Sequence, residues 1–140
     1  MTTRAQIVAT AREYLGTPFR HQGRLKGIAL DCVGLPICVA RDLGINLPDR
    51  RDYGPYPYAD LVLMECRKSL VEIPRSSIRM GDIVCLRENF AIHAGIITDL
   101  PPGLGLIHAH VFDKKVVEHS LTGLWSAMIA GVFLFPEVED

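Results

Sequence analysis

The sequence predicts an α+β fold in which helices from the first half of the chain pack on an antiparallel sheet from the second half. Residues 3–71 carry apolar side chains at helical spacing, interrupted by loops, whereas residues 80–137 carry short apolar strands separated by turn residues. A chain of 140 residues is long enough for one domain with a hydrophobic core. We therefore expect a single domain over residues 1–140.

Three helices are predicted in the first half, over residues 3–15, 32–43 and 59–71. Thr3 and Gln6 match a capping box at the start of the first helix, and Gly16 is a plausible stop after it. Gly44 is expected to end the second helix. The connecting stretches "GTPFRHQGRLKGIAL" and "PDRRDYGPYPYAD" are rich in turn residues, which indicates loops. The second of them carries three tyrosines and offers either a contact surface or an ordinary ordered loop.

Five strands are predicted in the second half, over residues 80–88, 90–99, 104–112, 114–120 and 131–137. Side chains alternate between the two faces of a strand, so His93 shares a face with Gly95 and Ile97. The turn "PPGLG" separates the second strand from the third. If these two strands pair as a hairpin, His108 on the third strand can approach His93.

The composition is typical of a globular protein, with 49% hydrophobic and 22% charged residues and a formal net charge of −1. This balance disfavours a nucleic-acid partner. The basic stretch "RHQGRLK" is either a solvated loop or a contact for an anionic substrate group. The N-terminus lacks the apolar run of a signal peptide, and no run has the length of a membrane span. We therefore expect synthesis in the cytoplasm and no membrane insertion.

The four cysteines contain no Cys-x-x-Cys pair, which disfavours a zinc ribbon or a thioredoxin-type pair. Cys38, Cys66 and Cys85 have apolar neighbours and fit the role of small buried side chains. Cys32 differs, because Asp31 is a good N-cap and places Cys32 in the first turn of a helix. The helix dipole and the free N–H groups there favour the thiolate, so we expect a low pKa for Cys32.

A cysteine nucleophile needs a base, and His93 is the candidate on the facing strand. His108 could hold the His93 ring in one orientation, as the third member of a Cys–His–X triad. Two alternatives stay open from the residues alone. His93 could be a structural histidine, or His93, His108 and His110 could form a zinc site.

Four stretches in this order, "LDCVGL", a "GD" that opens a strand, "HAGI" and "IHA", resemble the NlpC family of papain-like cell-wall cysteine peptidases. "YLGTPFRHQG" resembles the family's lead-in to the cysteine. The resemblance covers residues 4–136, and it looks closest to stand-alone members encoded with phage tails and gene-transfer particles. It implies a papain-like fold and hydrolysis of peptidoglycan stem peptides between D-γ-glutamate and the diamino acid.

The resemblance also implies roles for individual residues. Cys32 matches the nucleophile, His93 the base and His108 the orienting residue. Asp31 is implied to bind the free amino end of the substrate. From the basic stretch around it, we expect Arg20 to meet a charged end of the substrate as well. The reaction that the resemblance implies needs no metal and no organic cofactor.

The family pattern is not matched everywhere. Val33 replaces a serine implied in substrate binding, and Phe19 replaces a tyrosine that can support the oxyanion. Pro36 falls early in the catalytic helix and removes a backbone donor, so we expect an irregular first turn. Two other functions therefore stay open. One is a phage-tail or tail-tip component with a vestigial site, which would bind particle proteins and be incorporated in a phage-like particle, and the other is an amidase or acyltransferase on the same fold.

Overall fold

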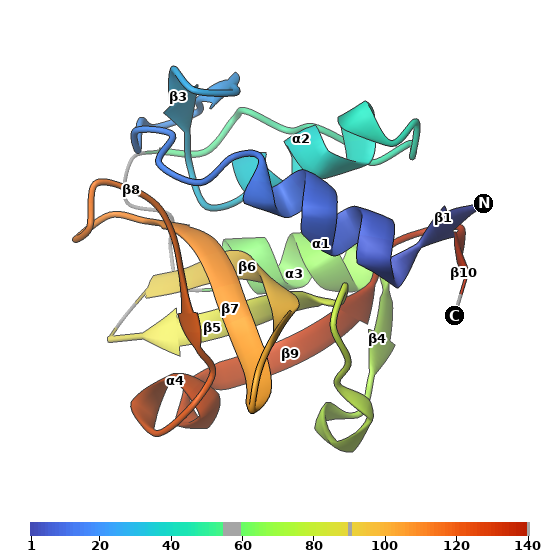
Figure 1. Cartoon of the computed structure of the whole chain (residues 1–140). Coiled ribbons are helices and arrows are strands. Elements are labelled where there is room, and N and C mark those ends of the chain that lie inside the picture. The colour runs from blue at the N-terminus through green and yellow to red at the C-terminus, as the bar shows by residue number, and fades with distance from the viewer. Residues whose placement is uncertain (55–59, 90, 140) are drawn as a thin grey trace.

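The computed structural model describes residues 1–54, 60–89 and 91–139 of the chain. Its main element is a six-stranded antiparallel sheet with the strand order β4-β9-β5-β6-β7-β8 (Figure 1). Its strands are β4 (Val71–Ile73), β5 (Ile83–Glu88), β6 (Ala91–Leu100), β7 (Gly103–His110), β8 (Lys115–Ser120) and β9 (Ile129–Leu134). The strands from β5 to β8 thus pair in chain order, whereas β9 returns to lie between β4 and β5.

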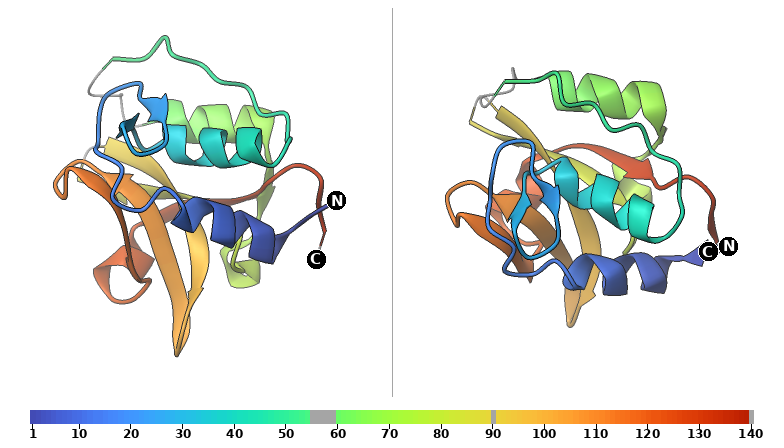
Figure 2. Two further views of the ribbon diagram at one scale, coloured as in Figure 1. Left: turned by 45° about the horizontal axis from the view of Figure 1, so that its top comes forward. Right: turned by 90° about the horizontal axis from the view of Figure 1, so that it is seen from above.

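Three helices lie on one face of the sheet, as Figures 1 and 2 show. They are α1 (Arg4–Arg12), α2 (Gly34–Asp42) and α3 (Leu61–Ser69). The shorter elements are β1 (Thr2–Thr3), β2 (Arg24–Leu25), β3 (Ala29–Leu30), the 3-10 turn η1 (Arg75–Ser77), α4 (Leu124–Ala127) and β10 (Val138–Glu139). None of the described helices has the length and hydropathy to cross a membrane. The predicted α+β class, with N-terminal helices on an antiparallel sheet, is confirmed.

The first helix begins at the predicted capping box. Thr3 Oγ1 accepts a hydrogen bond from Gln6 N at 3.1 Å, and Gln6 Oε1 accepts one from Thr3 N at 2.8 Å. The α-helix ends at Arg12, three residues earlier than predicted. The reason is that the next turn is closed by i→i+3 bonds, such as the bond from Tyr14 N to Ala11 O at 3.0 Å.

The second helix begins irregularly, as the position of Pro36 predicts. The N-cap of α2 is Val33, and Asp31 instead closes the turn before the helix, because Asp31 O accepts from Leu35 N at 3.3 Å and Asp31 Oδ1 accepts from Gly34 N at 2.8 Å. Pro36 has no N–H, so the carbonyl of Cys32 gains no i→i+4 bond and regular helix starts only at Gly34. Cys32 was predicted in the first turn of the helix, but it lies in the turn that precedes the helix.

Some predicted boundaries shift, and some predictions fall outside the described residues. The third helix begins at Leu61 and ends at Ser69, two residues before its predicted end. The described part of the predicted loop 48–60 contains neither helix nor strand. Tyr56, Tyr58 and residue 59 in that region, and Phe90 in the second predicted strand, lie outside the described residues.

The sheet has one strand more than the five predicted. β4 pairs with β9 at the edge of the sheet, with Glu72 opposite Phe133. Its three residues directly follow α3, and a segment of that length carries too little alternation to be recognised from sequence. The other five strands occupy the predicted segments with altered ends.

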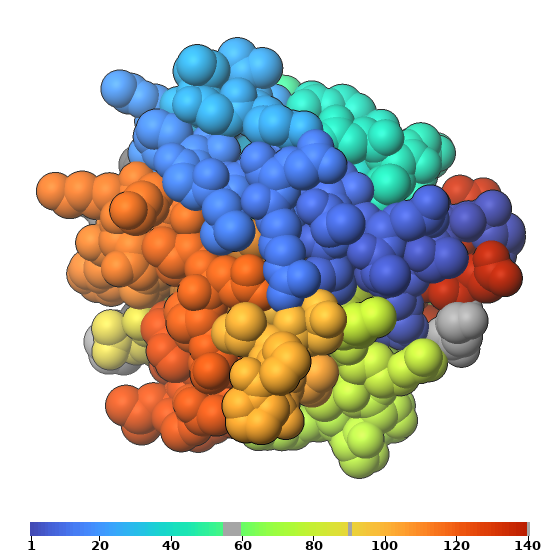
Figure 3. Space-filling view, viewed as in Figure 1, coloured from blue at the N-terminus to red at the C-terminus, as the bar shows by residue number. Residues whose placement is uncertain are grey.

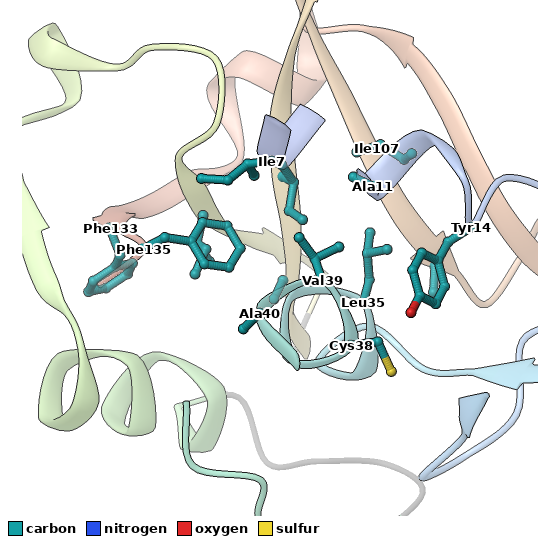
Figure 4. Packing of buried hydrophobic residues seen from close by; sticks show 14 of the residues in the cluster. Ile7, Ala11, Tyr14, Leu35, Cys38, Val39, Ala40, Ile107, Phe133 and Phe135 are labelled. Carbon is teal, nitrogen blue, oxygen red and sulfur yellow. The ribbon is translucent and has the colours of Figure 1, made fainter. Parts of the chain in front are cut away.

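Two apolar clusters fill the two faces of the sheet. The first joins the helices to the sheet through residues that include Ile7, Leu35, Val39, Ile107 and Phe133 (Figure 4). The second, on the opposite face, consists of Val84, Leu86, Ile97, Leu106 and Val132, with Trp125 and Met128 packed against it. Since Ala94 and Ile96 belong to the first cluster, the alternating residue His93 lies on the face of Trp125.

The N-terminal segment contacts two separate parts of the domain, the C-terminal strand β10 and the edge strand β8. Thr2 pairs in parallel with Val138, so the two ends of the described chain lie side by side (Figures 1 and 2). Near the other end of α1, Arg12 Nη2 contacts Glu118 Oε2 of β8 at 2.9 Å. Figure 3 shows the blue N-terminal segment packed on the orange strands of this face.

Candidate active site

Cys32 lies in the turn between β3 and α2 and reaches β6 where β6 and β7 separate. The ladder between these strands pairs residues 96–100 with residues 103–107 and does not include the first part of β6. Ile97 N donates to Asp82 O at 2.9 Å on the β5 side. Backbone N–H groups alternate along a strand, so the Ala94 N–H points the other way, into the opening beside β7. This amide interacts with the Cys32 sulfur, which therefore lies next to the residue that follows His93.

The structure brings the two predicted histidines together. His93 Nε2 and His108 Nδ1 are 3.1 Å apart, and the two rings stack with an interplanar angle of 16°. Within the described residues, the Cys32 thiol makes no hydrogen bond to either ring. Hydrogen bonds between catalytic groups commonly tighten only when substrate binds. The Cys32 sulfur thus lies beside the amide of Ala94, whereas the His93 side chain lies on the face of β6 that carries Trp125.

Sequence reasoning missed a third histidine, His119 on β8. Its Nε2 lies 3.0 Å from His108 Nε2, and its Nδ1 lies 3.1 Å from the carbonyl oxygen of Ser120. The register places His119 opposite Leu106, two residues before His108 on the same face of β7. Strand pairing between residues 104–112 and 114–120 was therefore the signal that could have found His119.

Trp125 covers this row of histidines. Its ring centroid lies 4.6 Å from that of His119, 5.0 Å from that of His108 and 6.4 Å from that of His93. Burial lowers the pKa of His93 to about 4, and it lowers the pKa of His108 to about 2, helped by the neighbouring rings. Both rings are therefore neutral at pH 7.

The low pKa expected for Cys32 is wrong. Burial raises the pKa of the thiol to about 12, and the negative charge of Asp31 adds to this effect. The amides of Ala94 and Val33 act in the opposite direction but do not outweigh burial. The resting site therefore holds a neutral thiol and a neutral His93 ring, rather than a thiolate and an imidazolium.

Asp31 is buried and fully engaged by the protein. Its Oδ1 accepts from Gly34 N and from Arg24 Nη1 at 2.9 Å, and its Oδ2 accepts from Gln22 N at 2.8 Å and from the Tyr53 hydroxyl. Sequence reasoning missed Arg24 and Tyr53, because their distance from Asp31 along the chain does not indicate that they bind its carboxylate. Asp31 holds the loop before α2 in place, and it can meet a substrate amine only by releasing one of these donors.

Backbone hydrogen bonds to Leu30 hold Phe19 and Arg20 beside the turn that contains Cys32. Leu30 N donates to Pro18 O at 3.0 Å, and Arg20 N donates to Leu30 O at 3.1 Å. The Phe19 side chain packs against the first apolar cluster, whereas the Arg20 side chain is exposed. Arg20 is thus accessible to a substrate, and Phe19 supplies an apolar wall without a hydroxyl group.

An apolar pocket borders the turn of Cys32 on the side of α3. Val33 and Ala94, whose amides contact the sulfur, both line it. Its other lining residues come from α2, α3, β5 and the loop before α3, and they are Pro36, Ile37, Leu47, Pro48, Val62, Glu65, Cys66, Ser69, Leu70 and Ile83.

The remaining cysteines have the structural roles that the sequence predicts. Cys38 and Cys85 are buried and Cys66 is partly buried, and all are free thiols. Cys85 Sγ lies 3.6 Å from Cys66 Sγ.

The predicted zinc ligands are engaged in other interactions. His110 Nδ1 lies 2.8 Å from Asp113 Oδ2, and its Nε2 lies 2.9 Å from Glu88 Oε1. Both nitrogens of His108 are likewise in contact with other imidazoles. Among the described residues, no group of three His, Cys, Asp or Glu side chains is arranged to hold a metal ion.

Solved structures with the same architecture decide the fold. An NlpC/P60 family protein from Bacillus cereus matches with a TM-score of 0.71 and 20% identity, over 95% of this chain and 40% of that chain. The chain has the NlpC/P60 fold. A lipoprotein-like NLP/P60 protein from Staphylococcus aureus matches with a TM-score of 0.68 and 19% identity, over 98% of this chain and 42% of that chain.

The NlpC/P60 fold also appears as a separate domain of matching length. The NlpC/p60 domain of peptidoglycan hydrolase SagA matches with a TM-score of 0.64 and 22% identity, over 94% of this chain and 98% of that chain. This chain spans about two fifths of the two longer proteins. No protein-family model and no curated protein matches its sequence.

Proposed function

We propose that the protein is an NlpC-family cysteine peptidase that hydrolyses peptidoglycan stem peptides between D-γ-glutamate and the diamino acid. The observation that carries this proposal is the pair of His93 and His108, 3.1 Å apart, at the strand opening where the Cys32 sulfur meets the amide of Ala94. The fold shared with the NlpC/p60 domain of a peptidoglycan hydrolase supports the substrate class.

The neutral thiol decides how the reaction starts. The Cys32 sulfur attacks the amide carbonyl while His93 takes its proton, so that the thiolate forms only as the C–S bond forms. Nε2 of His93 is hydrogen-bonded to His108, so Nδ1 of His93 is the nitrogen that remains to take the proton of Cys32. The backbone N–H of Cys32 lies in the turn just before α2, outside the regular helix, and it is our candidate oxyanion donor.

The same groups complete the cycle. His93 delivers the proton to the leaving amine as the C–N bond breaks, and a thioester on Cys32 remains. Water then attacks the thioester with His93 as base, the C–S bond breaks, and His93 returns the proton to the Cys32 sulfur; the product acid leaves and ionises in solvent. His108 holds the His93 ring throughout both steps.

Charged groups near the turn are our candidates for binding the substrate ends. Exposed Arg20 is available for a substrate carboxylate, because its backbone is held against Leu30 beside the Cys32 turn. Asp31 remains our candidate for the amino end, with a substrate ammonium replacing one of its present donors, such as the Tyr53 hydroxyl.

A second candidate function is acyl transfer or amide hydrolysis on an aliphatic substrate. The observation that favours it is the apolar pocket beside Val33 and Ala94, which would fit an aliphatic chain attached to the thioester. A third proposal is that the domain belongs to a phage-tail or gene-transfer particle and works there as a delivered hydrolase or as a structural component. The sequence resemblance to the phage-tail members supports this third proposal.

The test uses a soluble stem tetrapeptide with a free amino terminus, purified sacculi, and mass spectrometry of the products. We expect cleavage after D-γ-glutamate, abolished in Cys32→Ser and His93→Ala and retained in the matched control Cys66→Ser. Transfer or release of an acyl chain from an aliphatic amide or ester, without peptide cleavage, would favour the second function. Absence of any product under reducing conditions would contradict the hydrolase and favour a structural tail component.

A further inference from the structure

The imidazoles of His93, His108 and His119 form a hydrogen-bonded row. The row starts at the backbone carbonyl of Ser120, which can act only as an acceptor and lies 3.1 Å from His119 Nδ1. His119 Nδ1 must therefore carry the proton and donate it. In a neutral imidazole the other nitrogen then holds a lone pair, so His119 Nε2 is an acceptor.

The direction of the first bond fixes the next two. His108 Nε2 lies 3.0 Å from the lone pair of His119 Nε2, so His108 Nε2 carries the proton and His108 Nδ1 accepts. His93 Nε2, at 3.1 Å from His108 Nδ1, must then donate. The remaining nitrogen, His93 Nδ1, is left with its lone pair free to act as a base.

We propose that His119 is a positioning residue that sets the tautomer of His93 through His108, so that the base presents an unprotonated Nδ1 to the thiol of Cys32. This inference rests on the proposed hydrolase function for its catalytic consequence, whereas the tautomers themselves can be measured without any substrate.

The need for His119 follows from the symmetry of imidazole. A neutral His108 can carry its proton on either nitrogen, and with the proton on Nδ1 it would donate to His93 Nε2. His93 would then carry its own proton on Nδ1 and could not accept one from Cys32. In the Ser-His-Asp triad, likewise, a wrong histidine tautomer greatly lowers turnover.

The surroundings of His119 suit this role. Its backbone is fixed in the β7–β8 ladder opposite Leu106, and its ring packs on Trp125 at 4.6 Å. The lowered pKa values of His93 and His108 agree with the neutral state that the argument gives to these two rings. When His93 takes the proton of Cys32, its Nε2–H continues to donate to His108. No proton has to move along the row.

Imidazole 15N NMR of the wild-type protein at neutral pH tests the proposal directly. We expect His93 and His108 with the proton on Nε2, and His119 with the proton on Nδ1. The opposite tautomer at His93 would overturn the inference. Since the spectrum is recorded without substrate, this result stands even if the protein cleaves no stem peptide.

Variants at His119 then test the consequence for the reaction. His119→Ala removes the acceptor for His108, and we expect the 15N signals of His93 to show mixed tautomers and kcat to fall about tenfold with KM little changed. His119→Gln places an amide oxygen near the same point and should restore kcat to within about twofold of wild type. The control is Lys115→Ala, which changes an exposed side chain on the same strand, outside the row.

Urea unfolding separates catalytic loss from misfolding. If His119→Ala does not fold, the wild-type tautomers and the activity of His119→Gln decide the question. Wild-type kcat in a folded His119→Ala, with an unchanged tautomer at His93, would overturn the proposal.

Discussion

Replacing Gly95 by alanine should push β7 and His108 away from β6. Gly95 lies two residues after His93, and a Cβ added there would meet Leu106 Cδ1 at 2.7 Å, Ile107 O at 3.1 Å and His108 Cβ at 3.2 Å. Two of these atoms belong to side chains, but the Ile107 oxygen is backbone inside the ladder. The strand must therefore shift, and the base of the His108 side chain must shift with it.

The size of the effect can be worked out from these contacts. Overpacking a tight interior site costs about 1–3 kcal/mol. Replacing glycine by alanine also restricts the unfolded chain, which stabilises by about 0.4–1 kcal/mol. Taking the middle of each range, we expect Gly95→Ala to lose about 1.3 kcal/mol of unfolding free energy, the difference of these two effects. Gly103→Ala on β7 is the matched control, since its Cβ would have nothing within 4 Å.

The assay is urea unfolding at pH 7, followed by the fluorescence of Trp125, the single tryptophan of the chain. The control Gly103→Ala should be as stable as wild type or slightly more stable. Turnover of folded Gly95→Ala should also fall, because the contact between His108 and His93 is displaced. Equal unfolding free energies for the two alanine variants would refute the steric argument.

Three further predictions concern charge. Burial lowers the pKa of His108 from 6.5 to about 2. As the pH falls below 6.5, the His108 imidazole therefore becomes protonated in the unfolded chain but not in the folded protein. The unfolding free energy is therefore highest above pH 6.5 and decreases as the pH falls. His108→Gln should therefore flatten the dependence of unfolding free energy on pH by about 1.4 kcal/mol per pH unit between about pH 4 and 6, and an unchanged slope in urea titrations would contradict this. Alkylation of Cys32 by iodoacetamide should still accelerate at about pH 10, since its pKa is raised, whereas a plateau near neutral pH would show a resting thiolate. Asp31→Asn should lower the unfolding free energy by about 2 kcal/mol, because the buried Arg24 loses this charged partner and keeps Asp49, and Asp31→Asn combined with Arg24→Met should recover part of the loss in the same assay.

The parts of the fold that the sequence predicted are those set by local patterns. The capping box at Thr3 and Gln6 is local, and so is the effect of Pro36 on the first turn of α2. The pairing of His93 with His108 followed from two strands and one turn. By contrast, β4 is too short to show a period, and its place beside β9 depends on the return of the chain end.

The parts of the site that were missed depend on tertiary burial. The pKa of Cys32 was wrongly expected to be low, because the helix N-terminus is visible in sequence and the desolvation of the sulfur is not. His119 lies outside the four short stretches that carry the resemblance, and its role appears only once β8 is paired with β7. The donors around Asp31 come from Gln22, Arg24 and Tyr53, which only the folded loops bring together.

The protonated state of the Cys32 thiol has a consequence for the lifetime of the protein outside reducing conditions. Peroxides attack thiolates and spare thiols, and the products beyond the sulfenic acid are irreversible. A cysteine whose pKa is raised to about 12 by burial offers almost no thiolate to such oxidants while it waits for substrate. In the proposed reaction the sulfur becomes nucleophilic only as His93 accepts its proton, so we expect Cys32 to be oxidised more slowly in an oxidising medium than a resting thiolate would be.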